Sequence, residues 1–332
     1  MTRYRTNVVY SVAHFAIDFS CAFLVIRSVS AAMYQSDLLL LYNFLAFAMQ
    51  MPLGILADYS GNGRVFSAAG CLMIAVSSLF GAYPVWLCVL AGTGNALFHI
   101  GGGYDILSLS QGKAASLGLF VSPGALGLFA GTLMGRSSHA VWLVAMLMCI
   151  CSAAIISLCP HTAPACRQPA RNLTRNGLMV LVLLFLAVCL RSFGGFSFGF
   201  GWKNGIWAWV FVLCTVLGKA AGGLLCDRIG PLRTTVISLA AGALLFIGSS
   251  HPVPGCMAVL LFNMTMPVTL RSASDVLRDM PGFSFGLLTM ALFIGFIPMY
   301  ADCPVPDHPM TGAILCLITL ALLIPIFRRS FT

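Results

Sequence analysis

The sequence predicts an all-α membrane protein in which twelve transmembrane helices form two pseudo-symmetric six-helix bundles. Three observations lead to this fold class: a composition too apolar for a water-soluble protein, twelve long apolar runs, and a repeat that relates the two halves of the chain. Of the 332 residues, 59% are hydrophobic and 8% are charged. A soluble protein carries about 25% charged residues, so lipid must replace water around most of this chain.

Apolar runs long enough to cross a membrane occur twelve times, since a transmembrane helix needs about 20 mostly apolar residues. In the first half they cover roughly residues 8–27, 38–57, 65–83, 85–107, 114–135 and 139–159. In the second half they cover roughly residues 177–200, 205–225, 234–250, 253–270, 282–300 and 310–327. No small-residue cleavage site follows the first run, so we expect a retained helix and not a signal peptide.

One segment between the runs is long and polar. Residues 160–176 contain Pro, Arg and other polar residues, and they separate six runs from six. We therefore expect an N-terminal six-helix bundle at residues 1–159, a cytoplasmic linker at residues 160–176 and a C-terminal six-helix bundle at residues 177–332.

The positive charges predict the orientation of the chain. If both termini are cytoplasmic, the inner loops hold thirteen Lys and Arg residues and the outer loops hold three. Positive residues concentrate in cytoplasmic loops, so we expect both termini on the inner side of the cell (inner) membrane. The net charge of +9 is spread over these loops and not gathered on one soluble face, which argues against nucleic acid as a partner.

The two halves contain related sequences. Residues 54–64 read GILADYSGNGR and residues 223–233 read GLLCDRIGPLR. The residues that match at an offset of 169 are Gly54, Asp58, Gly61 and Arg64 in the first copy, and Gly223, Asp227, Gly230 and Arg233 in the second. Two parallel six-helix repeats predict a pseudo-two-fold axis along the membrane normal and a substrate site near the midplane between the halves.

The repeated loop resembles the loop motif of the major facilitator superfamily. The first copy departs from the motif at Tyr59, where the motif prefers Arg. Together with the twelve runs and the repeat, this resemblance implies a secondary transporter. It also implies a gate, in which charge pairs hold one conformation and break in another. The motif residues assigned to this gate are Asp58, Arg64, Asp227, Arg228 and Arg233.

A narrower resemblance is to the fosmidomycin-resistance-like branch of that superfamily. The branch carries an H-x-x-x-D pair in its first span, similar to His14 and Asp18, and an L-R-S sequence in its seventh span, similar to residues 190–192. Its fourth span resembles GTGNALFH, which ends at His99, but here Ile100 and Gly101 follow where the branch usually has Pro and Glu. This resemblance implies a proton-driven exporter of small toxic compounds.

His14 and Asp18 are ionisable residues inside the first apolar run, and their i, i+4 spacing places both on one face of a helix. Ionisable groups at this depth are costly and normally face a protein interior or a water-filled cavity. Burial favours a neutral Asp18 and a nearby cation favours an ionised one, which is the behaviour that a proton carrier needs. We expect Asp18 to couple protons, with His14 as its partner or as a second carrier. The alternative is a fixed polar contact between helices.

Two cations lie within the runs of the second half. Arg191 stays charged and makes bidentate contacts with carboxylates and phosphates. We expect it to bind an anionic group of the substrate or to act as the counter-charge of Asp18. Lys219 lies about 12 Å along its helix from Asp227. It is either a second cation for the substrate or a pairing residue that snorkels toward the surface.

Polar residues of the fourth run extend the candidate site. Asn95 and His99 again share one helix face, and we expect them to contact substrate, or a proton in the case of His99. Asn263 recurs at an offset of 168 from Asn95 and is a further substrate candidate. Asp105 lies nearer the cytoplasmic end, where we expect a gate or a salt bridge with a loop.

No metal-ligand cluster and no nucleophile–base pattern has credible spacing, so we expect no cofactor, no metal and no enzymatic activity. The sequence favours a monomeric, proton-coupled transporter of a small anionic or polar organic molecule, working by alternating access. The resemblance favours export by antiport, whereas the cationic residues fit uptake of an organic anion by symport equally well. A ligand sensor or a lipid-handling protein is the alternative from another class.

Overall fold

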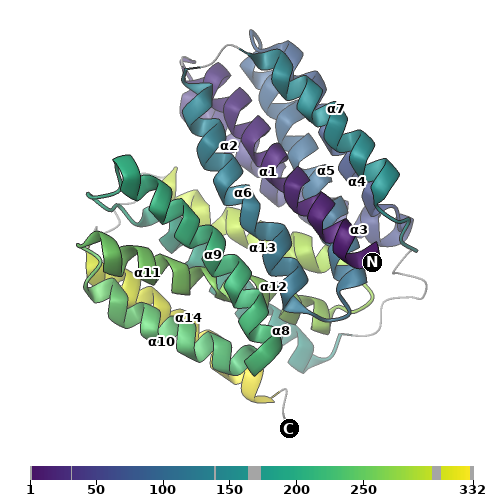
Figure 1. The fold of residues 1–332 in the computed structure, drawn as a ribbon. Coiled ribbons are helices and arrows are strands. Elements are labelled where there is room, and N and C mark those ends of the chain that lie inside the picture. The colour runs from purple at the N-terminus through teal and green to yellow at the C-terminus, as the bar shows by residue number, and fades with distance from the viewer. Residues whose placement is uncertain (1, 31, 138–139, 164–172, 301–307, 330–332) are drawn as a thin grey trace. The chain divides into compact units, whose positions relative to one another are not determined.

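The described residues of the computed structural model form helices and contain no strand (Figure 1). The structure describes residues 2–30, 32–137, 140–163, 173–300 and 308–329. Most of the predicted linker, at residues 164–172, lies outside the described residues.

The elements follow one another as the apolar runs predict. The first part of the chain forms α1 (Thr2–Val29), α2 (Gln35–Asn43), the π-helical η1 (Phe44–Ala48), α3 (Gln50–Ser60), α4 (Gly63–Ser77), the short η2 (Ser78–Phe80), α5 (Pro84–Ser110), α6 (Ala114–Gly135) and α7 (Val141–Leu158). The second part forms α8 (Arg175–Ser197), α9 (Gly205–Ile229), α10 (Pro231–Ile247), α11 (Pro252–Asn263), α12 (Thr265–Val276), α13 (Pro281–Phe296), the short η3 (Ile297–Met299) and α14 (Pro309–Arg329).

The number of spans agrees with the prediction. Within the described residues, 11 helical stretches are long and apolar enough to cross a membrane. The helix α10 is also apolar but shorter, with 17 residues, and it provides the twelfth span. The twelve-helix fold class is therefore confirmed, and the chain is a multi-pass membrane protein.

Two of the spans are interrupted helices, and a proline stands at each interruption. Between α2 and α3 the backbone winds as a π-helix, and Pro52 lies in the first turn of α3. Between α11 and α12 the helix breaks at Met264, and Pro267 lies in the first turn of α12. Proline lacks a backbone N–H and its ring clashes with the preceding turn, so it disturbs a continuous α-helix at these positions.

The chain divides into two compact units. Unit 1 comprises residues 1–111, 123–170 and 277–290, and unit 2 comprises residues 112–122, 171–276 and 291–332. In unit 1, α4 and α1 pack on α5, and in unit 2, α10 packs on α14 while α9 packs on α11. The helices α6 and α13 contribute residues to both units. The division of the chain into bundles at residues 159 and 177 remains a prediction.

The repeated glycines end two of the helices. Gly61 follows α3 with a φ of 66°, and Gly230 follows α9 with a φ of 88°. Glycine adopts positive φ readily because it has no Cβ. Each glycine therefore turns the chain just after a repeated aspartate, which places Asp58 and Asp227 on the last turns of α3 and α9.

Candidate functional site

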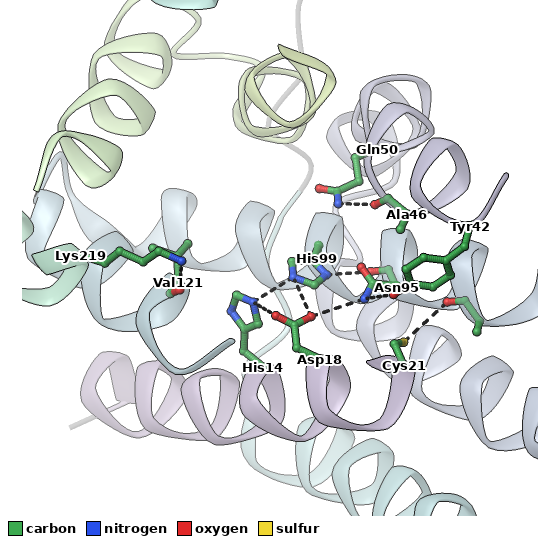
Figure 2. A network of polar contacts seen from close by, with 11 residues as sticks. His14, Asp18, Cys21, Tyr42, Ala46, Gln50, Asn95, His99, Val121 and Lys219 are labelled. Atoms are coloured by element: carbon green, nitrogen blue, oxygen red, sulfur yellow. Dashed lines mark hydrogen bonds and ion pairs between the residues drawn. The ribbon is translucent and has the colours of Figure 1, made fainter. Parts of the chain in front are cut away.

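A cluster of polar side chains lies inside unit 1, where α1 faces α5 (Figure 2). On α1, the His14 Nε2 atom lies 3.2 Å from Asp18 Oδ2. On α5, His99 Nε2 lies 2.9 Å from His14 Nε2 and 3.8 Å from Asp18 Oδ1. Asn95 Nδ2 donates to Asp18 Oδ1 over 3.4 Å. The structure thus brings together four of the residues that the sequence predicts for proton and substrate binding.

This cluster is largely shielded from solvent. The side chains of His14, His99 and Asp18 are 6%, 12% and 21% exposed, respectively. A buried carboxylate is costly unless hydrogen bonds or opposite charges compensate for its lost hydration. Asp18 receives this compensation from the His14 ring and the Asn95 amide.

The hydrogen-bond partners of the two imidazole rings indicate which ring nitrogens carry a hydrogen. His99 Nδ1 lies 2.9 Å from the carbonyl oxygen of Asn95, which accepts but cannot donate, so Nδ1 carries a hydrogen. A neutral His99 then has a bare Nε2, and the hydrogen of the 2.9 Å contact belongs to His14 Nε2. That same hydrogen faces Asp18 Oδ2. With this assignment His14 donates and His99 accepts in the contact between the two rings.

Gly124 of α6 packs directly against this cluster. A Cβ at this position would touch Asp18 Oδ2 and would lie 2.5 Å from His14 Nε2, closer than real Cβ atoms approach other atoms. Glycine is thus the residue that lets α6 lie against the charged groups of α1. The same face of α6 continues with Gly127, Gly131 and Gly135, which approach the backbone of Phe15, Phe19 and Phe23.

By spacing alone, the nitrogens of His14 and His99 and the carboxylate of Asp18 would suit a metal ion, since they all lie within 4.8 Å of one another. A metal needs the bare lone pair of each ring nitrogen. A bound metal would displace any hydrogen that lies between the two Nε2 atoms. The absence of a metal from this cluster therefore remains a prediction.

Sequence reasoning missed Tyr42 of this cluster. The hydroxyl of Tyr42, on α2, accepts a hydrogen bond from Asn95 Nδ2 over 3.4 Å. Gly124 contributes the close approach of α6. A tyrosine in an apolar run looks like a packing residue, so the sequence gives no signal of its role. Gly124, in contrast, begins a stripe of glycines with Gly127, Gly131 and Gly135, and such a stripe indicates close helix packing.

The predicted cations of the second half belong to unit 2. Arg191 of α8 is 8% exposed, and its Nη1 donates to Thr269 Oγ1 over 3.2 Å. Lys219 of α9 is half-buried, and its Nζ lies 3.5 Å from the carbonyl oxygen of Val121. Asp18 belongs to unit 1, so its pairing with Arg191 remains a prediction. Thr269 is a partner that sequence reasoning missed.

The two repeated asparagines differ in their contacts. Asn95 donates to Asp18 across helices, whereas the Nδ2 of Asn263 donates to the carbonyl oxygen of Val259 in its own helix over 2.9 Å. A substrate role for Asn263 remains a prediction.

The two repeated aspartates each hold the start of a helix. Asp58 accepts hydrogen bonds from the backbone N–H groups of Gly282 and Phe283 over 2.7 and 2.8 Å, at the start of α13. Asp227 accepts from residues 114 and 115 over 2.8 and 3.0 Å, at the start of α6. The offset of 168 residues that relates the repeats also relates these partners, so the contacts are reciprocal. Carboxylates satisfy the free N–H groups of a helix start and interact favourably with its dipole.

The arginines of the predicted gate have fewer contacts. Arg64 Nη1 donates to the carbonyl oxygen of Cys159 over 3.4 Å, while Arg228 and Arg233 are exposed. Asp227 pairs with Arg271, whose Nη1 lies 3.3 Å from Asp227 Oδ1. Sequence reasoning counted Arg271 only among the loop charges and missed this pair. The gating roles of all these residues remain predictions.

Asp105 lies in the last turns of α5 and is fully buried. It accepts hydrogen bonds from Tyr10 and Thr162 over 2.5 and 2.7 Å. Among the described residues it forms no ion pair within 4.0 Å. The expected role of Asp105 as a gate or as a salt-bridge partner of a loop remains a prediction, because residues 164–172 of the nearby loop lie outside the described residues.

Comparison with known proteins supports the fold. No protein-family model matches the chain, and no curated protein matches it. Among solved structures, the E. coli fucose:proton symporter FucP matches with a TM-score of 0.72 and 13% identity, over 99% of each chain. A second FucP structure, in the outward conformation, matches with a TM-score of 0.65 and 12% identity, over 96% of this chain and 99% of that one.

The human organic anion transporter MFSD10 matches with a TM-score of 0.70 and 14% identity, over 97% of this chain and 100% of that one. At these identities the likeness concerns the fold, which is that of major facilitator superfamily transporters. The narrower resemblance to the fosmidomycin-resistance-like branch is not supported by these neighbours.

Proposed function

We propose that this chain belongs to the major facilitator superfamily and is a secondary active transporter, not an enzyme. It moves a small anionic or polar organic molecule by alternating access and couples that movement to protons. The observation that carries this proposal is the buried cluster of Asp18, His14 and His99, in which two imidazole nitrogens lie 2.9 Å apart beside a carboxylate.

Proton coupling is assigned to Asp18 and His14. With both rings neutral, the cluster carries the negative charge of Asp18, which is costly inside a membrane protein. Binding one proton neutralises the cluster. A proton on Asp18 removes the negative charge that attracts the His14 ring and the Asn95 amide, so proton binding also weakens the contact between α1 and α5. A change in charge is thereby converted into a change in helix packing.

Substrate binding is assigned first to Arg191, whose buried guanidinium suits a carboxylate or phosphate group. Lys219, Asn95, His99 and Asn263 are the further candidates. FucP and MFSD10 are described as a fucose:proton symporter and an organic anion transporter, which agrees with a polar or anionic substrate.

Gating is assigned to the aspartates that hold the starts of α6 and α13, together with the nearby arginines of the motif. We place a monomer in the cell (inner) membrane with both termini in the cytoplasm, on the basis of the Lys and Arg distribution. Export by antiport ranks slightly ahead of uptake by symport, because of the resemblance to the fosmidomycin-resistance-like branch.

A ligand screen followed by a transport assay tests this proposal. Purified protein is screened by thermal shift against organic anions, neutral sugars and antibiotics, in parallel with Arg191→Ala and Arg191→Lys. We expect one anionic or polar class to stabilise the native protein, Arg191→Ala to lose that stabilisation and Arg191→Lys to keep part of it. The hits then enter proteoliposomes with an imposed pH gradient. A ligand that binds but neither accumulates nor exchanges would show that the protein is not a transporter.

A further inference from the structure

Asp105 lies in a second polar cluster of unit 1, formed with Tyr10 of α1 and Thr162 of the segment after α7. The carboxyl group of Asp105 is fully buried, and its partners in the described part of the chain are hydroxyl groups. Gly63, at the start of α4, packs against this carboxyl so closely that a Cβ there would collide with Oδ1. A buried carboxyl group whose described hydrogen-bond partners are neutral hydroxyl groups is a candidate for carrying a proton.

The hydrogens of this cluster can be counted. The Thr162 hydroxyl lies 2.7 Å from Asp105 Oδ1 and 3.1 Å from the carbonyl oxygen of Gly61, and it has one hydrogen to donate. If Asp105 is ionised, that hydrogen is drawn to the carboxylate, and the Gly61 carbonyl loses its partner. If Asp105 is protonated, Oδ1–H donates to Thr162, Thr162 donates to Gly61, and Tyr10 still donates to Oδ2. With Asp105 protonated, each of the hydrogen bonds that join Tyr10, Asp105, Thr162 and Gly61 therefore has its own hydrogen.

We propose that Asp105 is a second proton-binding site, and that its proton holds the turn between α3 and α4 through Thr162 and Gly61. Gly61 ends α3, three residues after Asp58. Asp58 in turn holds the start of α13 through the N–H groups of Gly282 and Phe283. Loss of the Asp105 proton loosens the turn and weakens the anchor of α13. The link to gating rests on the proposed transport function, whereas the proton chemistry of Asp105 does not.

The charged and titratable groups around Asp105 fit this assignment. Tyr10 donates its hydroxyl hydrogen, and Arg64 is the positive charge that acts on Asp105. Burial, followed by the charge of Asp105, raises the pKa of the nearby Cys159 thiol to about 12, while Arg5 and Arg64 oppose the shift. Cys159 therefore stays neutral at physiological pH and does not compete with Asp105 for protons.

Arg64 offers a partner for the ionised state. Its Nη1 donates to the Cys159 carbonyl, but its buried Nε has no hydrogen-bond partner among the described residues. A negative charge on Asp105 attracts this guanidinium. A pair between Arg64 and Asp105 would then form when the proton leaves, in place of the contact between Thr162 and Gly61.

The Asp105 cluster is separate from the Asp18 cluster. Tyr10, His14 and Asp18 follow one another at four-residue intervals along one face of α1. The ring of Phe98 lies against both Tyr10 and His14, with ring centroids 6.3 and 6.1 Å apart, respectively. An apolar ring between them allows the two sites to be altered one at a time.

Hydrogen–deuterium exchange of the full-length protein in nanodiscs tests the proposal. Protection of the peptide at residues 57–66, corrected for the intrinsic pH dependence of exchange, is compared at about pH 5.5 and about pH 8.5. We expect the protection factor to fall roughly five- to tenfold at the higher pH, because this is the change in an opening equilibrium that the loss of one hydrogen bond produces. Asp105→Asn, whose amide can donate to Thr162 at any pH, is expected to keep the high protection at both pH values. Asp279→Asn, at an exposed carboxylate, is the matched control and should behave as wild type.

The Thr162 variants provide a second readout if Asp105→Asn does not fold. Thr162→Ser keeps a hydroxyl and should retain the pH dependence, whereas Thr162→Val should show low protection at both pH values. A wild-type pH change in either Asp105→Asn or Thr162→Val would overturn the proposal.

Asp18→Asn should lose proton-coupled transport and keep the pH dependence of residues 57–66. If Asp18→Asn loses that dependence instead, the sensor is Asp18 and the proposal is wrong, whereas absence of transport by wild type contradicts only the proposed function.

Discussion

The Nε2 atoms of His14 and His99 lie 2.9 Å apart, so a single hydrogen joins a ring of α1 to a ring of α5. The hydrogen bond of His99 Nδ1 to the Asn95 carbonyl assigns that hydrogen to His14. Asp18 Oδ2 lies 3.2 Å from the same His14 nitrogen and competes for the hydrogen. Four predictions follow from this cluster and from the two reciprocal helix contacts.

Replacing the central carboxylate should uncouple transport from protons. Asp18→Asn keeps the size of the side chain and the acceptor for Asn95, but it cannot lose or gain a proton. In proteoliposomes we expect substrate accumulation driven by a pH gradient to fall at least about tenfold, equivalent to about 1.4 kcal/mol. Asp37→Asn, at an exposed position in α2, is the control. If Asp18→Asn retains accumulation with its pH dependence intact, Asp18 does not carry the coupled proton.

The two histidines should be energetically coupled, because their Nε2 atoms lie 2.9 Å apart. A double-mutant cycle with His14→Gln and His99→Gln, measured by unfolding in detergent, should give a coupling energy of about 0.5–3 kcal/mol. The exposed His251 provides a control: the effects of His251→Gln and His14→Gln should be additive. A coupling energy of zero between His14 and His99 would contradict a hydrogen bond between the two rings.

A methyl group on the facing helix should disturb the cluster. Gly124→Ala places a Cβ against Asp18 and His14, so α6 or the cluster must move, at a cost of roughly 1–3 kcal/mol in the free energy of unfolding. Proton-coupled transport should fall with it. Gly81→Ala is the matched control, because no atom lies within 4 Å of the position of its Cβ. Equal stabilities of the two variants would show that α6 does not press on the cluster.

The reciprocal helix contacts should have similar strength. Asp58→Asn and Asp227→Asn each remove a charge and one of two acceptors at a helix start, which should cost about 1 kcal/mol in each case. Amide exchange should rise at residues 282–283 in the first variant and at residues 114–115 in the second. Arg233→Gln alters an exposed motif residue and should change stability by no more than about 0.5 kcal/mol. A large loss for Arg233→Gln with none for the aspartates would reverse the proposed roles.

Much of the fold could be predicted from the sequence, because a lipid bilayer restricts the structures that can cross it. Runs of about 20 apolar residues must form helices, and this rule recovers the number and order of the spans. Helix breaks are harder to predict. Pro52 and Pro267 accompany interruptions, whereas Pro123 lies inside the continuous helix α6. The difference depends on neighbouring helices that the local sequence does not specify.

The candidate site was predictable where ionisable residues share a helix face. The pairs of His14 with Asp18 and of Asn95 with His99 were expected within α1 and α5, and the structure places the two pairs against each other. Tyr42 could not be predicted, because its role arises from a contact between distant segments. The glycine stripe that includes Gly124 indicates close helix packing, but not which helix it approaches. The contacts of Asp105 with the hydroxyl groups of Tyr10 and Thr162 could not be predicted either, whereas its expected role as a gate or a salt-bridge partner remains a prediction.

The reciprocal contacts of Asp58 and Asp227 have a consequence for the origin of the chain. Each carboxylate comes from one repeat, and each helix start that it holds comes from the other. A lone six-helix repeat would need a second copy of itself to make this bond, and a symmetric pair of copies would make it twice. Gene duplication and fusion would therefore have converted a contact between the subunits of a homodimer into one within a single polypeptide. Either half expressed alone should regain the contact between the aspartate and the helix start by forming a homodimer.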